Sequence, residues 1–149
     1  MGVAPLHDIG KVCLPRELID SSQKYLLNDA EREIMKVHVE CGAIMLDIPG
    51  KDRGRQTRIN LALHVIRGHH YPEYGPGNPK RSLAADIVKV VDVLDAGTSI
   101  RPYKTAMPFE QVVEEWIMKH QGTMFDTEVT NTFYYHKTEF KSLHQQFQG

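Results

Sequence analysis

Apolar residues recur at helical spacing along nearly the whole chain. In one segment Ile34, Val37, Cys41 and Ile44 or Met45 follow one another at intervals of three or four positions, which places them on one face of an α-helix. No segment shows the sustained alternation of apolar and polar residues that is typical of a β-strand. The pattern therefore predicts an all-α fold of about five to seven helices, with their apolar faces turned inward.

Residues that cap or stop helices indicate where the predicted helices begin and end. Asn28, followed by Glu31 three residues later, is close to a capping box. Ser82 is expected to cap a helix that closes at Gly97, a residue type that commonly stands just past a helix end. The other predicted helices are 15–20, 57–68, 108–122 and a last one that begins at Asp126 and carries Val129, Phe133, Phe140, Leu143 and Phe147.

Histidines interrupt two of the apolar faces. His38 lies within the stripe of its helix, and His69 and His70 continue the inward face of the 57–68 helix at its carboxyl end. A buried imidazole needs partners for both ring nitrogens. A core histidine bonded to a carbonyl or carboxylate is the alternative for His38, and a favourable charge at the negative helix end is the alternative for the pair. One histidine would suffice for that charge, so the second favours a role as ligands.

Aspartates stand in similar apolar surroundings. Asp92 and Asp95 lie three residues apart in an apolar helix, where a carboxylate needs a cation, a metal or hydrogen-bond donors. An internal salt bridge or a helix cap is the alternative for each of them. The dipeptide His7-Asp8 sits among apolar neighbours near the amino terminus, and such a pair is common by chance.

Together, four separate segments offer histidine or aspartate from an apolar face. Imidazole and carboxylate are ligands for Fe, Mn, Zn and similar ions. A mixed set without thiolate disfavours a structural zinc site, and it favours a hydrolytic site in which an aspartate bridges two metals that activate a water. Lys11, Arg101 and Lys104 would supply positive charge near such a site for a phosphate substrate.

Composition limits the class of protein further. The 149 residues are 41% hydrophobic and 25% charged, which suits a single globular domain over 1–149. The net charge of -1 gives no bias toward a nucleic-acid polymer, and no apolar run is long enough to span a membrane. Cys13 and Cys41 lie in apolar segments and are interpreted as reduced core thiols. We therefore expect a cytoplasmic protein.

Several segments occur in the order found in HD-GYP proteins. They are HDIGK (7–11), MKVHVECGAIML (35–46), HH (69–70), GPGNP (75–79) and DVLDAGTSIRPYKTAM (92–107), and GTMFDTEV (122–129) resembles the closing segment of that family. The chain is thus identified as similar to the HD-GYP family of metal-dependent phosphohydrolases. The resemblance implies a helical bundle with a bi- or trinuclear metal centre and, as in many members, hydrolysis of cyclic di-GMP to pGpG or GMP.

The resemblance also implies roles for individual residues. Asp8 would bridge the metals, and Lys11 would contact the scissile phosphate or the attacking water. Arg101 and Lys104 would hold the phosphates of a cyclic dinucleotide. The implied metal ligands are His7, Asp8, His38, His69, His70 and Asp92. Two or more divalent ions are expected, Fe or Mn first, with Zn, Ni and Mg as alternatives.

The sequence also departs from the family pattern. Asn78 replaces the tyrosine of the GYP motif, and Tyr71 stands where a glutamate usually follows the two histidines. The chain begins six residues before His7, so we expect it to form the C-terminal portion of the family domain and to lack the family's first helices. The apolar surface left exposed predicts a homodimer, of which exchange of helices between copies is one form.

Two other functions remain open at this point. One is a non-catalytic relative that binds metal or nucleotide and works through protein contacts, which the loss of the GYP tyrosine would favour. The other is a different HD-type phosphohydrolase that cleaves nucleotides or other phosphate esters, against which the RPYK segment (101–104) argues.

Overall fold

The computed structural model describes residues 3–22, 26–47, 53–70, 82–100 and 104–147. Over these ranges the chain forms helices and no β-strand, so the all-α prediction is confirmed. The α-helices are α1 (Arg16–Ser22), α2 (Asp29–Leu46), α3 (Arg53–Gly68), α4 (Leu83–Thr98), α5 (Phe109–Gln111), α6 (Thr127–Tyr135) and α7 (Lys137–Phe147). The remaining helical segments, of 3-10 or π type, are η1 (Ala4–Leu6), η2 (Ile9–Cys13), η3 (Val112–Ile117) and η4 (Met118–His120).

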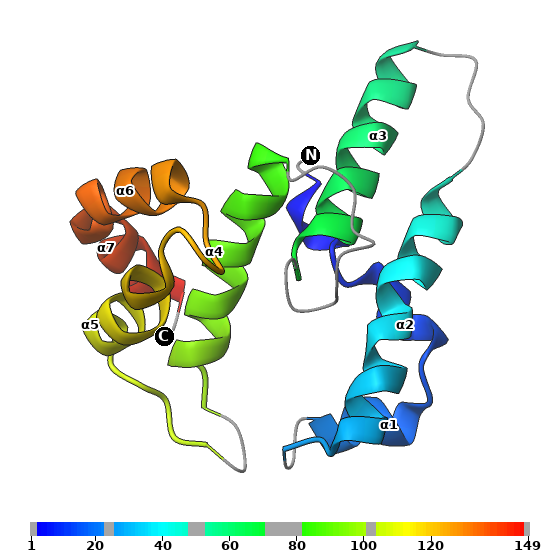
Figure 1. Cartoon of the computed structure of the whole chain (residues 1–149), viewed down its shortest axis with the longest axis horizontal. Helices are drawn as coiled ribbons and strands as arrows, with labels where there is room; N and C mark the ends of the chain where they lie inside the picture. The colour runs from blue at the N-terminus through cyan, green and yellow to red at the C-terminus, as the bar shows by residue number, and fades with distance from the viewer. Residues whose placement is uncertain (1–2, 23–25, 48–52, 71–81, 101–103, 148–149) are drawn as a thin grey trace.

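Helix α4 runs through the middle of the molecule (Figure 1). It packs against α3 on one side and against α5, η3 and α6 on the other. The largest apolar core lies on the second side and consists of Val90, Leu94, Phe109, Val112, Val113, Ile117, Phe125, Val129 and Phe133. On the first side, η2 and α3 both pack against α2. The polar residues of interest gather there, away from this core.

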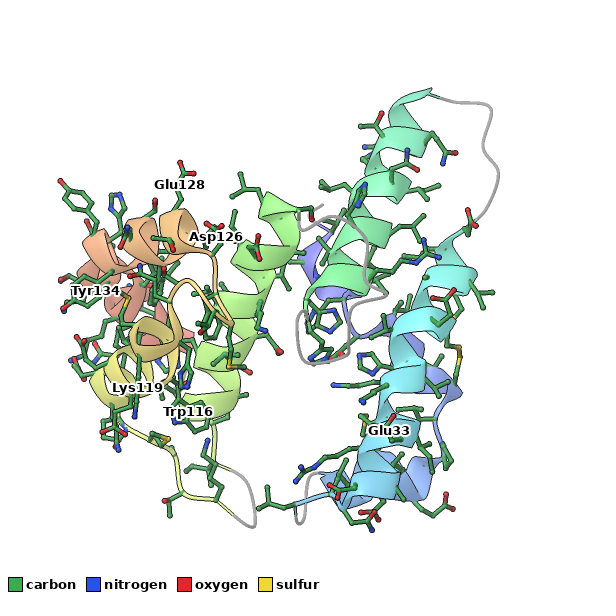
Figure 2. The ribbon with its side chains drawn as sticks, viewed as in Figure 1. Glu33, Trp116, Lys119, Asp126, Glu128 and Tyr134 are labelled. Atoms are coloured by element: carbon green, nitrogen blue, oxygen red, sulfur yellow. A yellow bond between two sulfur atoms is a disulfide. The ribbon has the colours of Figure 1, made fainter. Side chains whose placement is uncertain are left out.

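Most helix starts follow the capping residues read from the sequence. Asn28 and Glu31 form a complete capping box, in which each side chain accepts a hydrogen bond from the other residue's backbone N–H. The Ser82 hydroxyl accepts from the N–H of Ala85. Asp126, labelled in Figure 2, caps the start of α6, where its carboxylate accepts two backbone N–H groups.

Two predicted helix ends are wrong. Gly97 lies inside α4, which continues to Thr98. The glycine serves close packing there and does not end the helix, because a Cβ at this position would lie 2.7 Å from Val112 Cγ2 of η3. The last predicted helix is two helices, which break at His136 (φ -98, ψ 16). The break lets α7 fold back on α6, so that the rings of Phe133 and Phe140 lie 5.0 Å apart.

The apolar stripe of α2 does not face the core. Ile34, Val37 and Ile44 are 46%, 52% and 68% exposed, so the predicted orientation of this helix is wrong. The face that α2 buries carries His38, Gly42 and Ala43. Small residues on that face allow close packing against η2, and this packing brings His38 inward.

The two cysteines form a disulfide. Cys13 of η2 and Cys41 of α2 are bonded, with their Cα atoms 6.6 Å apart, and Cys13 is exposed. The interpretation of both as reduced core thiols is therefore wrong. The bond ties the short η2 segment to α2 across 28 residues of sequence.

Among the described residues, no helix has both the length and the apolar character needed to cross a bilayer.

Candidate metal centre

Four of the predicted ligands meet at one point. Asp8, His38, His69 and His70 each offer a ligand atom, and these atoms all lie within 4.8 Å of one another. Asp8 is the residue that precedes η2, His38 is in the middle of α2, and the two histidines follow α3 directly. Three segments that are far apart in sequence thus converge on one cluster.

The histidine rings are oriented by the backbone. In three of them Nδ1 donates a hydrogen bond to the carbonyl three residues earlier: His7 to Ala4 at 2.7 Å, His38 to Met35 at 2.6 Å and His69 to Ile66 at 2.8 Å. In His38 and His69 this bond places the ring proton on Nδ1, so the Nε2 lone pair is left for another partner. These carbonyls could have been found from the sequence, because a helical turn places a histidine ring beside the carbonyl three residues earlier.

The Nε2 atoms face one oxygen of Asp8. His38 Nε2 lies 3.4 Å and His69 Nε2 3.9 Å from Asp8 Oδ1. Asp8 Oδ1 and His69 Nε2 are buried and form no hydrogen bond within the described part of the chain. Buried acceptor atoms that face one another with no proton between them raise the free energy of the folded protein. A cation would satisfy all of them, so the donor set fits a divalent metal.

The other oxygen of Asp8 faces a second group. His7 Nε2 lies 3.4 Å from Asp8 Oδ2 and 3.7 Å from Asp92 Oδ1. Lys11 pairs with the same Asp8 oxygen through its ammonium group. The Asp8 carboxylate therefore stands between two sets of ligand-type side chains, one on each oxygen.

The charge states of the ligands follow from these contacts. The carboxylates of Asp8 and Asp92 raise the pKa of His7 to about 10. Burial, aided by the nearby His70, lowers the pKa of His69 to about 3, and burial also lowers the pKa of His38. Burial opposes ionisation of the Asp8 carboxyl, but contacts from His7 and Lys11 outweigh it and hold that pKa well below its usual range.

The two aspartates of α4 are separated by the fold. Asp92 is half-buried and faces His7, and the net effect of this contact is to lower the pKa of the Asp92 carboxyl despite its burial. Asp95 is exposed, three residues further along the helix. Of the two sequence candidates, Asp92 alone contacts the cluster among the contacts described above.

Of Arg101 and Lys104, the predicted phosphate-binding residues, only Lys104 lies within the described residues. Lys104 Nζ stands 4.2 Å from the ring centroid of Trp116 and 3.5 Å from the Ala96 carbonyl. Figure 2 shows Trp116 near the carboxyl end of α4. Arg101 and the GPGNP segment, with Asn78 and Tyr71, lie outside the described residues.

Comparison with known proteins finds a matching family and several similar proteins. The family model described as "HD domain" matches residues 3–129. The chain is 32% identical over 146 residues to the 3′3′-cGAMP-specific phosphodiesterase 2 of Vibrio cholerae, a match that covers 94% of this chain and 26% of that protein. It is also 32% identical over 136 residues to the cyclic di-GMP phosphodiesterase of Thermotoga maritima, covering 87% of this chain and 35% of that protein. The chain thus spans about a quarter to a third of the length of these relatives.

Proposed function

The chain belongs to the HD domain family, within its HD-GYP members, and from that membership we propose that it is a metal-dependent phosphodiesterase of cyclic dinucleotides. Cyclic di-GMP is the proposed substrate, with pGpG or GMP as products, and a related cyclic dinucleotide such as 3′3′-cGAMP is the close alternative. The names of the relatives support this substrate class, because both kinds of cyclic dinucleotide occur among them.

The position of the Asp8 carboxylate carries the proposal. Its Oδ1 faces His38 and His69, and its Oδ2 faces His7, which in turn lies beside Asp92. A carboxylate with imidazoles on both oxygens is arranged as a bridge between two metal ions. His70 adds a further ligand-type side chain to the cluster with Asp8, His38 and His69. We therefore assign His7, Asp8, His38, His69, His70 and Asp92 as ligands of a centre with two or more divalent ions, Fe or Mn first.

The residues of the chain would divide the chemistry among them. When bound, the divalent ions would polarise the phosphodiester and lower the pKa of a water nucleophile. Asp8 and the histidines hold these ions in a buried site, and the Lys11 ammonium places a positive charge beside Asp8, where it would stabilise charge on the scissile phosphate. Arg101 and Lys104 would bind the substrate phosphates through the positive charges of their side chains.

The aspartates of α4 provide a matched test. Asp92→Asn removes a charged ligand that contacts His7, whereas Asp95→Asn makes the same chemical change at an exposed position of the same helix. With Mn(II) present, we expect the rate of cyclic di-GMP hydrolysis to fall by about 10- to 100-fold or more in Asp92→Asn and to stay near wild type in Asp95→Asn. Rates would be measured by chromatography of pGpG and GMP, with 3′3′-cGAMP as a parallel substrate.

Three results would contradict the proposal. Equal rates in the two variants would remove Asp92 from the centre. Metal bound by the wild-type protein without turnover of either dinucleotide would favour the non-catalytic alternative. Hydrolysis of mononucleotides alone would favour a different HD-type phosphohydrolase.

We also propose that the protein is a homodimer. The support is the apolar surface of two helices: Ile34, Val37 and Ile44 on α2, and Leu83 and Ile87 on α4, are all between 46% and 68% exposed. Monomeric proteins rarely expose apolar stripes of this kind. A second copy of the chain, docked face to face or through exchanged helices, would cover them.

A further inference from the structure

We propose that Gly10 is a positioning residue of the metal centre: its bare backbone lets η2 dock directly on α2 and so sets the distance between Asp8 and His38. The inference rests on the proposed function, because it assigns Gly10 a part in metal binding. It concerns a residue that offers no ligand atom and whose role arises from steric contact alone.

No side chain fits at position 10. A Cβ there would lie 1.9 Å from the carbonyl oxygen of His38 and 2.4 Å from the backbone nitrogen of Gly42. Both atoms belong to the backbone of α2, which cannot rotate aside as a side chain can. Restoring ordinary contact with the His38 oxygen would move η2 away from α2 by about 1.5 Å, since non-bonded heavy atoms rest roughly 3.5 Å apart.

Such a movement would act directly on the ligands. His38 supplies both the carbonyl that touches Gly10 and the imidazole that faces Asp8, and Asp8 stands only two residues before Gly10. The present separation of Asp8 Oδ1 and His38 Nε2 is 3.4 Å. Metal–ligand distances tolerate changes of about 0.2 Å, so a shift of η2 by an ångström or more would break the shared coordination.

The short η2 helix depends on this contact for its position. It has five residues, and an isolated helix of that length is not stable in water. Its docking surface on α2 is Gly42, one turn after His38, where a Cβ would lie 3.1 Å from Gly10 N and 3.3 Å from Ile9 Cγ2. The two glycines therefore meet back to back, and an added methyl group is worse tolerated at Gly10 than at Gly42.

Three glycine-to-alanine variants test the proposal. Gly10→Ala and Gly42→Ala change the η2–α2 contact, while Gly97→Ala creates a clash with a side chain on the other side of α4, 2.7 Å from Val112 Cγ2. Each full-length variant would be titrated with Co(II), and its affinity and visible absorption spectrum would be recorded. Circular dichroism and thermal unfolding would report whether each variant is folded.

The three variants are expected to differ in how much they weaken Co(II) binding. Gly10→Ala weakens Co(II) binding by roughly 10- to 100-fold and changes the ligand-field spectrum, as loss of support around metal ligands does. Gly42→Ala has a smaller effect in the same direction. Gly97→Ala lowers the melting temperature but keeps the affinity and the spectrum of the wild type, because its clash lies away from the ligands.

The opposite results separate the two proposals. A folded Gly10→Ala protein with wild-type affinity and spectrum overturns the role of Gly10. If Gly10→Ala does not fold, Gly42→Ala decides: wild-type affinity and spectrum there overturn the proposal, and a weakened, altered site supports it. Failure of the wild-type protein itself to bind Co(II) would refute the proposed metal centre and, with it, this inference.

Discussion

His7 differs from the other histidines of the centre in its protonation. Its pKa is raised to about 10 by Asp8 and Asp92, so the ring is protonated at pH 7 in the metal-free protein. The pKa values of His38 and His69 are lowered, so these rings are neutral and ready to bind metal. Metal ligands must be deprotonated. A metal ion that binds His7 therefore has to displace its proton.

This difference predicts proton release on metal binding. At pH 7 the wild-type protein should release about one proton more per chain than His7→Asn when Mn(II) binds, because neutral His38 and His69 release none. Calorimetry in buffers of different ionisation enthalpy measures the number of protons released. The same proton release in both proteins would show that His7 is not a ligand.

The sequence indicated which residues are candidate ligands, but it did not show which of them contact one another. His7, Asp8, His38, His69, His70 and Asp92 were all proposed from polar residues in apolar faces and from the family resemblance, and the structure brings Asp8 together with the histidines. Of Asp92 and Asp95, the family resemblance selected Asp92 as the candidate ligand, whereas the apolar helix pattern suited both. Two residues three positions apart share a helix face only approximately, so the position of α4 relative to His7 decides which one reaches the cluster.

At the scale of elements, α2 shows the limit of periodicity. The spacing of Ile34, Val37 and Ile44 correctly indicates that they share a face, but it does not say what that face meets. The orientation of α2 is fixed instead by the contact of Gly42 with Gly10 and by the disulfide between Cys13 and Cys41. These contacts join segments that are distant in sequence, so no local pattern reveals them.

The disulfide gives a prediction for the same pair of elements. A bond that closes a loop of 28 residues stabilises a protein by about 3 kcal/mol, so a reducing agent should lower the melting temperature of the wild type. The Cys13→Ser/Cys41→Ser double variant should melt near the temperature of the reduced wild type in both conditions, because it lacks the bond with or without reductant. Thermal unfolding by circular dichroism measures this, and identical melting of the wild type with and without reductant would argue against the bond.

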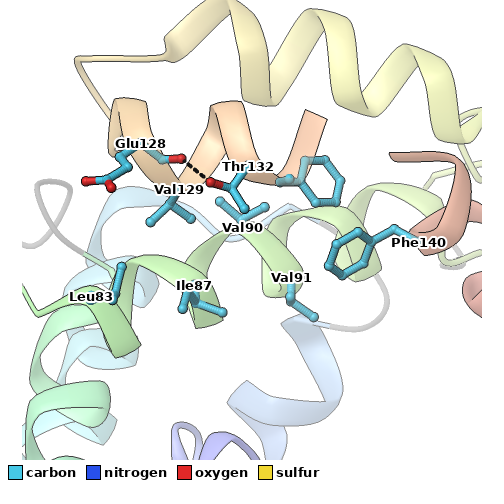
Figure 3. A pocket seen from close by; sticks show the side chains of 9 residues that line it. Leu83, Ile87, Val90, Val91, Glu128, Val129, Thr132 and Phe140 are labelled. Carbon is cyan, nitrogen blue, oxygen red and sulfur yellow. Dashed lines mark hydrogen bonds between the residues drawn. The ribbon is translucent and has the colours of Figure 1, made fainter. Parts of the chain in front are cut away.

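At the scale of the whole molecule, α4 joins two parts with different tasks. The α5–α7 side contains an apolar core, while the α1–α3 side carries the cluster of Asp8, His38, His69 and His70 (Figure 1). Beside the core, α4, α6 and α7 also form an apolar groove of about 380 Å³ (Figure 3). Its lining residues are Leu83, Ile87, Val90, Val91, Glu128, Val129, Thr132, Phe133 and Phe140. The fold class was predictable from sequence, whereas this groove depends on the break between α6 and α7.

The groove gives a prediction about assembly. If a second copy covers it, Ile87→Glu should shift the protein from dimer to monomer, because a charge would be buried in an apolar contact. Tyr135→Glu, at a position 82% exposed on α6 and outside the groove lining, serves as control and should remain dimeric. Light scattering at micromolar concentration measures both masses. A monomeric wild-type protein would contradict the proposed dimer.

The central claim is that Asp8 organises a metal centre that cleaves cyclic dinucleotides. The most direct measurement is the formation of pGpG or GMP from cyclic di-GMP by protein loaded anaerobically with Fe(II) or Mn(II), beside Asp8→Ala under the same conditions. We predict product with the wild-type protein and a rate at least about 100-fold lower in the variant. A folded, metal-loaded wild-type protein that forms no product, or an Asp8→Ala variant that is equally active, would contradict the claim.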